Sequence, residues 1–177
     1  MCTGSGWQHP ALRNLIEDHR RLLQEADAIK FWIVDSLRDL SVDEISTALH
    51  AFWELHGLAH LREEEEILFP LCRAYIPEWA EFEAQIVGEH HRLREQVAQL
   101  LALSPSDARF TVGFDAIYEF LRNHCRHEER VVYALISEKL PDAQWQEYEH
   151  LSRFFREQHR PSDAHWDQPF GATDDNA

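Results

Sequence analysis

Apolar side chains recur every three or four residues along most of the chain, which is the spacing of one face of an α-helix. The most regular stripe consists of Phe114, Ile117, Leu121, His124, Glu128, Val131 and Leu135. Such a stripe predicts an amphipathic helix and does not fit the two-residue alternation of a half-buried strand. With six Gly and seven Pro among 177 residues, the sequence predicts an all-α protein.

Turn signals divide the pattern into four long helices joined by short loops. The first helix is expected from Pro10, a residue suited to a first helical turn, to about residue 38. Ser41 and Glu44 form a capping-box pattern at the start of the second helix. The expected core stripe of this helix is Ile45, Leu49, Trp53, His56, His60, Glu64, Ile67 and Leu71.

The third helix is followed by an expected loop at residues 104–109, and Thr111 is the predicted cap of the fourth helix. Because short connections place neighbouring helices antiparallel, the sequence predicts an up-down-up-down four-helix bundle. Residues 142–159 are predicted to form an extra C-terminal helix. We therefore expect one domain over residues 1–160, followed by a mobile acidic tail at residues 161–177.

The second and fourth helices carry an internal repeat. Residues 60–71 (HLREEEEILFPL) and 124–135 (HCRHEERVVYAL) share a His, two Glu at the fourth and fifth places beyond it, and apolar residues after that. Each copy follows a helix with one stripe His, which is His19 in the first half and His90 in the second. The repeat predicts two helical hairpins of similar design.

Six stripe residues carry side chains suited to metal binding: His19, His60, Glu64, His90, His124 and Glu128. A His and a Glu four residues apart lie side by side on one helix face. At about 1.5 Å of rise per residue, all six positions fall in one layer of an antiparallel bundle. An ionised Glu is rarely buried without a partner, and these stripes contain no Lys or Arg. A bound cation would supply the missing positive charge.

This set of donors favours two metal ions. Four imidazoles and two carboxylates exceed what one tetrahedral zinc accepts, and a set without thiolate suits iron or manganese. The predicted cofactor is a non-haem di-iron centre bridged by Glu64 and Glu128, with manganese or zinc as alternatives. Taken singly, a stripe His such as His19 or His90 is more often a packed core residue, so the prediction depends on the six together.

Other polar residues nearby have less specific interpretations. Four carboxylates form charge runs that are typical of a solvated helix face: Glu63, Glu65, Glu66 and Glu129. Glu65 and Glu129 are nevertheless candidates to orient an imidazole. His56, one turn before His60, is a candidate fifth His ligand or a core residue. Cys125 is expected to be a small buried side chain between helices.

The net charge of −15 argues against nucleic acid and against an anionic membrane surface as partners, because both would repel the chain. No basic segment precedes an apolar one at the N-terminus, and no run of 18 apolar residues occurs. Three widely spaced Cys suit a reducing compartment. The expectation is a cytoplasmic protein. The aromatic segment at residues 145–155 is expected to be a packing helix or a contact of a homodimer.

The order of single His, His-x-x-x-Glu, single His and His-x-x-x-Glu resembles the hemerythrin and HHE cation-binding family. The likeness covers about residues 10–139 and lies in the phrases EDHRRL, HLREEEEILFP, EHHRLR and HCRHEERVVY. The resemblance implies an up-and-down bundle around an oxo- or hydroxo-bridged di-iron centre. It also implies that the centre meets a small molecule such as O2, NO or peroxide.

One departure from the family bears on function. Hemerythrins that carry oxygen use five His, two of them one turn apart on the third helix, whereas Arg94 stands at the fourth place after His90. This weakens the case for reversible oxygen carriage. The expected function is binding of, or reaction with, a small ligand in sensing, scavenging or stress protection. The alternatives are a redox enzyme that reduces peroxide or NO, and iron storage or delivery, including iron-sulfur cluster repair.

Overall fold

The structure is a computed structural model that describes residues 8–35 and 41–159. Within these residues the regular structure is entirely helical, which confirms the all-α prediction. The predicted end of the first helix near residue 38 and the predicted acidic tail lie outside the described residues. In the described part of the chain, no helix is both long and apolar enough to cross a lipid bilayer.

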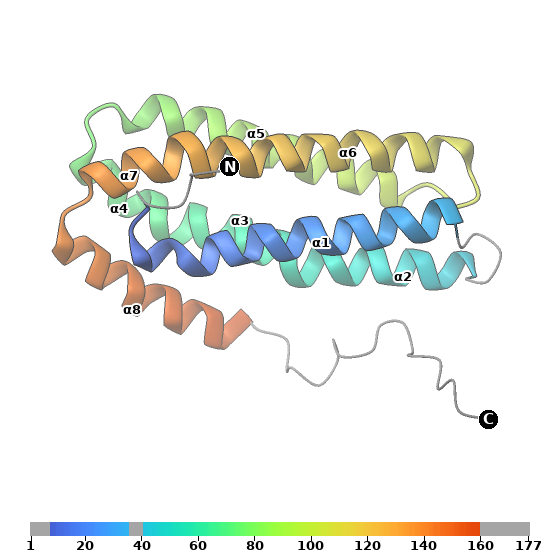
Figure 1. Cartoon of the computed structure of the whole chain (residues 1–177), viewed down its shortest axis with the longest axis horizontal. Helices are drawn as coiled ribbons and strands as arrows, with labels where there is room; N and C mark the ends of the chain where they lie inside the picture. The colour runs from blue at the N-terminus through green and yellow to red at the C-terminus, as the bar shows by residue number, and fades with distance from the viewer. Residues whose placement is uncertain (1–7, 36–40, 160–177) are drawn as a thin grey trace, which may run out of the picture.

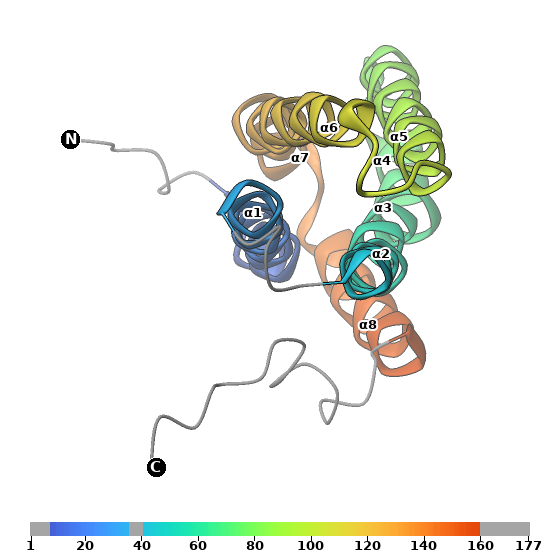
Figure 2. The same cartoon turned by 90° about the vertical axis from the view of Figure 1, so that its right-hand side faces the viewer.

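Four helical rods form an up-down-up-down bundle (Figure 1). The first rod is η1 (Pro10–Leu12) and α1 (Arg13–Asp35). The second is α2 (Val42–Phe52), η2 (Trp53–Gly57), α3 (Leu58–Glu63), η3 (Glu64–Leu68) and α4 (Phe69–Tyr75). The third is α5 (Trp79–Leu101), and the fourth is α6 (Ala108–His127), η4 (Glu128–Val132) and α7 (Tyr133–Lys139). Seen end-on in Figure 2, the rods surround one common axis.

Side-chain caps set two of the helix starts. At the start of α2, the Ser41 backbone N–H donates to Glu44 Oε2 at 2.7 Å and the Glu44 N–H donates to Ser41 Oγ at 3.3 Å, which confirms the predicted capping box. Thr111 as the cap of α6 is wrong. Asp107 caps that helix by accepting the Arg109 N–H at 2.8 Å, so α6 begins at Ala108, within the predicted loop. Asp is as good an N-cap as Thr, and Asp107 comes before Thr111 in the chain, so the helix begins earlier than predicted.

Three π turns interrupt the second and fourth rods, at η2, η3 and η4. Each π turn accommodates one extra residue. Beyond it, the residues that face the core therefore lie one place later in the sequence than α-helical spacing predicts. After Glu64 and Glu128 the fully buried residues therefore lie one place beyond the predicted stripe, and the predicted Ile67, Leu71 and Leu135 are partly buried against the core. The predicted core residue Val131 is 43% exposed. The residues that are buried there are Leu68, Phe69 and Cys72 in the second rod and Val132, Tyr133 and Ile136 in the fourth.

The C-terminal helix α8 (Asp142–His159) packs on the outside of the bundle, as predicted for residues 142–159. It contacts α3, η3 and η1, so it covers the first helical hairpin (Figures 1 and 2). Trp145, Tyr148 and Phe155 are buried on the side of α8 that faces the bundle. These aromatic side chains are therefore used in packing within the chain.

Candidate metal centre

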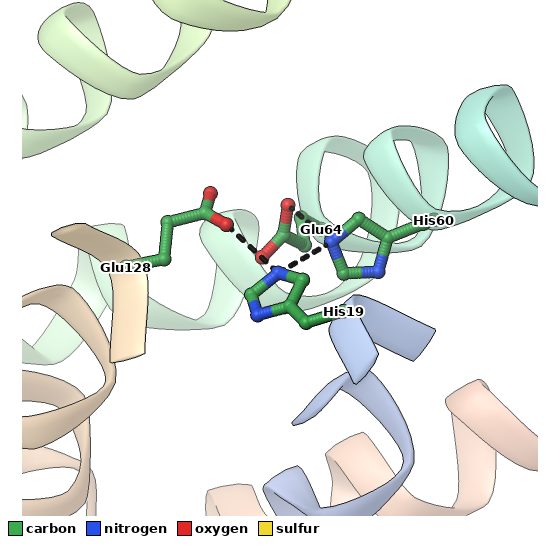
Figure 3. A group of neighbouring side chains, drawn as sticks. All are labelled: His19, His60, Glu64 and Glu128. Atoms are coloured by element: carbon green, nitrogen blue, oxygen red, sulfur yellow. Dashed lines mark hydrogen bonds and ion pairs between the residues drawn. The ribbon is translucent and has the colours of Figure 1, made fainter. Parts of the chain in front are cut away.

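The six predicted donors converge in the middle of the bundle, and each is at most 3% exposed: His19, His60, Glu64, His90, His124 and Glu128. Figure 3 shows His19, His60, Glu64 and Glu128, which reach one point from three rods. His19 Nε2 lies 2.9 Å from His60 Nε2 and 3.0 Å from Glu128 Oε2. The donor atoms of these four residues lie within 4.8 Å of one another, which is close enough to hold one metal ion.

A second group of donors consists of His90, His124 and Glu128. Glu128 Oε1 lies 3.3 Å from His90 Nε2, and Glu128 Oε2 lies 3.3 Å from His124 Nε2. Glu128 thus belongs to both groups. Glu64 Oε2 lies between them, 3.7 Å from His60 Nε2 and 3.4 Å from His90 Nε2. The arrangement is two adjacent donor groups that share a carboxylate.

Several buried atoms in this cluster lack a hydrogen-bond partner among the described residues. They include Glu64 Oε2, Glu128 Oε2 and His124 Nε2, all of which point into the cluster. Among the described ion pairs, Glu64 and Glu128 have imidazole partners and neither has a Lys or Arg partner. Buried polar atoms are normally satisfied, so these orphaned acceptors indicate a site suited to hold a cation. The residues present therefore fit a metal centre.

Each of the four imidazoles has a carboxylate behind its outer nitrogen, Nδ1. The distances from Nδ1 to the carboxylate oxygen are 3.0 Å for His19 and Glu129, 3.9 Å for His60 and Asp18, 2.7 Å for His90 and Glu65, and 2.9 Å for His124 and Glu89. A carboxylate within hydrogen-bond distance, as behind His19, His90 and His124, fixes the tautomer and the orientation of the ring and leaves Nε2 for a metal. Asp18 lies beyond hydrogen-bond distance of His60. All four Nε2 atoms face the cluster.

These outer carboxylates follow the internal repeat. Glu65 and Glu129, each directly after a cluster Glu, stand where an imidazole-orienting role predicted them. Asp18 and Glu89 were missed by the sequence reasoning, although each directly precedes a stripe His. That shared position, an acid just before the single His of each hairpin, was the available signal. Each hairpin therefore supplies acids to the imidazoles of its own rods and of the other hairpin.

Without metal, the carboxylates of the cluster favour the protonated imidazoles of His19 and His90. Burial disfavours the charged ring, but the neighbouring carboxylates of Glu128 and Glu129 outweigh burial and raise the pKa of His19 to about 10. In the same way Glu128, Glu64 and Glu65 raise the pKa of His90 to about 11. Burial opposes ionisation of Glu128, but the surrounding imidazoles hold its pKa well below the ordinary value. The cluster thus favours cations, whether protons or metal ions.

Tyr133 breaks the symmetry between the two donor groups. Its hydroxyl donates to Glu64 Oε1 at 2.5 Å, and its ring stacks on His19 with 5.6 Å between centroids. The equivalent residue in the first copy of the repeat is Phe69, which stacks near His90 and has no hydroxyl. One oxygen of Glu64 is therefore already hydrogen-bonded, and Oε2 remains for a metal.

Two expectations near the cluster need revision. Glu63 was expected on a solvated face, but it is 1% exposed because α8 covers it. His56, the candidate fifth ligand, lies outside both donor groups and faces Glu25, with 4.0 Å from its Nε2 to Glu25 Oε1. It lines a cavity of about 110 Å³ between α1, α3 and α8. Cys125 is buried with a free thiol, as expected.

Comparison with known proteins gives one family match over most of the chain. The sequence model of the Hemerythrin HHE cation binding domain matches residues 8–136. A DNA nickase from Nostoc sp. (strain PCC 7120 / SAG 25.82 / UTEX 2576) is 28% identical over 90 residues, which is 51% of this chain and 25% of that protein. The chain thus aligns with about a quarter of that relative's length. No solved structure matches the chain significantly.

Proposed function

Because the chain belongs to the Hemerythrin HHE cation binding domain family, we propose that its buried cluster holds a pair of iron ions. The proposed ligands of the first iron are His19, His60, Glu64 and Glu128, and those of the second are His90, His124 and Glu128. Glu128, which belongs to both donor groups, would join the two ions. The proposal is supported above all by the orphaned, buried oxygens of Glu64 and Glu128.

Iron is proposed over zinc because of the number and type of donors. A structural zinc site is closed by four ligands, whereas the second group has three protein donors and leaves open coordination positions. Imidazole and carboxylate without thiolate suit iron, with manganese as the nearest alternative. A ferrous pair, when bound, supplies a place for a small ligand and electrons to reduce it.

We propose that the ligand is a small molecule such as O2, NO or peroxide, and that the role is sensing, scavenging or stress protection. The six donors are at most 3% exposed, so the cluster excludes bulky substrates. Two apolar clusters lie on either side of the donor layer. The chain's own contribution is to bind the metals, orient the imidazoles through the outer carboxylates and exclude water.

A redox enzyme that reduces peroxide or NO is the second candidate, and Tyr133 favours it. Burial and the neighbouring Glu64 and Glu128 raise the pKa of Tyr133 well above its ordinary value, so the hydroxyl keeps its proton. The hydroxyl lies at the cluster and donates to Glu64 Oε1 at 2.5 Å. The cluster therefore has a protonated hydroxyl beside it, which holds Glu64 in place by a hydrogen bond while a small ligand is reduced.

The test is anaerobic loading of the purified protein with ferrous iron, followed by metal analysis and exposure to O2. We expect an iron pair in each chain. A spectrum that reverses when O2 is removed supports binding or sensing, whereas rapid, irreversible conversion to a diferric state supports redox chemistry. A chain that holds a single tightly bound zinc and takes up no second metal would contradict the di-iron proposal.

Nucleic acid is not proposed as a partner, despite the partial likeness to a DNA nickase. The net charge of −15 opposes contact with a phosphate backbone. We expect the iron-loaded protein to leave supercoiled plasmid intact in the presence of magnesium. Conversion of the plasmid to the nicked form would contradict this expectation.

A further inference from the structure

The helix α8 lies beyond the residues that match the family, which end at residue 136. It nevertheless places a charged side chain close to the metal centre. Arg156 Nη2 lies 2.5 Å from Asp18 Oδ2 and 2.6 Å from Glu63 Oε2. One guanidinium of α8 thus pairs with a carboxylate of α1 and a carboxylate of α3, both in the first hairpin.

The contacts around Glu63 show how α8 is fixed in place. Glu63 Oε1 accepts hydrogen bonds from Tyr148 at 2.9 Å and from Ser152 at 2.7 Å, and Arg156 pairs with its other oxygen. Glu63 is 1% exposed, so without these partners its charge would be buried and uncompensated. The register of α8 on the bundle is therefore determined, and Arg156 is held beside Asp18.

Asp18 connects Arg156 to the metal centre. Its Oδ2 lies 3.9 Å from His60 Nδ1, on the outer side of a ring whose Nε2 faces the first donor group. His60 Nδ1 is buried and has no hydrogen-bond partner among the described residues, and Asp18 is the carboxylate that the described ion pairs place beside it. Arg156, Asp18 and His60 thus form a line that runs from α8 to the proposed first iron.

The second hairpin lacks this connection. The position equivalent to Glu63 in the repeat is His127, whose Nδ1 lies 3.4 Å from Glu89 Oε1. Glu89 stands behind His124 at 2.9 Å, and its described partners do not include a residue of α8. Asp18, behind His60, is therefore paired with an Arg of α8, whereas Glu65, behind His90, is paired with Arg94 of α5 and Glu89 has no described partner on α8.

We propose that Arg156 is a positioning residue for the metal centre, which holds Asp18 behind His60 so that docking of α8 sets the affinity of the first iron site. This inference rests on the proposed di-iron function. Arg156 does not contact the donor cluster, and its effect passes through Asp18. The competing explanation is that Arg156 only anchors α8 to the bundle.

Five variants separate these explanations. Arg156→Met removes the guanidinium but keeps a long side chain beside the cavity, and Asp18→Asn removes the charge behind His60. Glu63→Gln weakens the anchoring of α8 and leaves the Arg156–Asp18 pair in place. Arg153→Met is the matched control, because Arg153 is exposed on the same helix. Arg156→Lys keeps a positive charge and tests for rescue.

Each full-length variant is loaded with ferrous iron under anaerobic conditions, and the iron retained is measured against increasing chelator. Mössbauer spectra report the two irons separately. Loss of an outer partner of a metal-binding His typically weakens metal affinity about 10- to 100-fold. We expect Arg156→Met and Asp18→Asn to weaken one iron site by about tenfold or more, with the other site unchanged. Arg153→Met should resemble the wild type, and Arg156→Lys should recover part of the loss.

The thermal stability of each variant is compared with its loss of iron, because a residue that only anchors α8 would lower both together. If Arg156→Met and Glu63→Gln lose iron equally, from both sites and in proportion to their loss of stability, Arg156 is an anchor and the inference is overturned. Wild-type affinities for both irons in Arg156→Met overturn it as well. A wild-type protein that holds no iron pair overturns the proposed function itself. If Arg156→Met does not fold, an iron site weakened in Asp18→Asn and in Arg156→Lys supports the inference, and unchanged sites in both overturn it.

Discussion

Glu128 differs from the other donors because its two oxygens face both donor groups. Oε1 lies 3.3 Å from His90, and Oε2 lies 3.0 Å from His19 and 3.3 Å from His124. Glu64 presents a single unpaired oxygen, because its other oxygen accepts the Tyr133 hydroxyl. The two Glu residues, equivalent in the sequence repeat, are therefore not equivalent in the site.

The first prediction follows from this difference. Glu128→Ala should abolish binding of both irons, since each donor group then loses a shared carboxylate and its negative charge. Glu64→Ala should chiefly weaken the iron at His19 and His60. Metal analysis after anaerobic loading measures the difference, with Glu66→Ala as the control because Glu66 is exposed. Equal iron loss in Glu64→Ala and Glu128→Ala would contradict the unequal roles assigned here.

The second prediction concerns pH in the metal-free protein. The pKa of His19 rises from 6.5 to about 10 on folding. A pKa raised on folding contributes stability that is fully present below the unfolded value and is lost as pH rises through the folded value. The free energy of unfolding of the metal-free protein should therefore fall between about pH 6.5 and pH 10.

Urea denaturation at intervals across this pH range measures the effect. His19→Gln is the control, since it cannot form the imidazolium and should lose less stability over the same interval. His90, with its pKa raised to about 11, should extend the wild-type decline above pH 10. A wild-type stability that is constant or rising over this window would show that the imidazolium–carboxylate pairs do not form without metal.

At the level of single residues, much of the site could be predicted from the sequence. The positions of His60 and Glu64 on a helical stripe depend on local spacing alone, and the same holds for His124 and Glu128. The burial of Glu63 could not be predicted, because it depends on where α8 packs. A helical period identifies which residues share a face, but it does not specify which later helix covers the opposite face.

At the scale of elements, the π turns explain the main error in the predicted core. Both η3 and η4 begin at the cluster Glu, so the α-helical spacing holds from His60 to Glu64 and fails beyond it. The shift buries Phe69 in one rod and Tyr133 in the other. Tyr133 reaches Glu64 because of this shift. A pattern of fixed period cannot reveal an inserted residue when apolar side chains occupy both candidate positions, as at 131 and 132.

The third prediction tests the packing of the π turn η2. A Cβ added to Gly57 would lie 2.3 Å from Trp53 Cε3, in a buried part of the second rod. Gly57→Ala should therefore lower the free energy of unfolding by about 1–3 kcal/mol, despite the better helix propensity of Ala. Thermal denaturation of the metal-free variant measures the change.

Gly88 provides the matched control for this prediction. A Cβ added to Gly88, on the exposed side of α5, meets no atom within 4 Å. Gly88→Ala should raise the free energy of unfolding by about 0.5–1 kcal/mol through helix propensity alone. If both substitutions stabilise the protein, the contact between Gly57 and Trp53 does not restrict the backbone there.

At the scale of the whole molecule, the donor layer divides the apolar core in two. Along α1, His19 lies between Leu15, in one apolar cluster, and Leu22, in the other. Along α5, His90 likewise lies between Ile86 and Leu93. Each of the four rods therefore contributes to both clusters and to the polar layer between them. Without metal, the layer consists of imidazole and carboxylate groups with unsatisfied atoms in the middle of the bundle.

The last prediction is that metal loading stabilises the whole bundle. A ligand present at 100 times its dissociation constant raises the free energy of unfolding by about 2.7 kcal/mol, which corresponds to a rise in Tm of roughly 5–10 °C in a chain of this size.

Because the donors come from all four rods, hydrogen exchange should slow most at the amides beside the layer, in α3, η3 and η4. The distant end of α2 should change least. Calorimetry of metal-free and iron-loaded protein at one pH measures the first effect, and exchange mass spectrometry measures the second. Identical melting curves and exchange patterns would mean that iron is held outside this layer, since a cation that joins four buried rods must resist their separation.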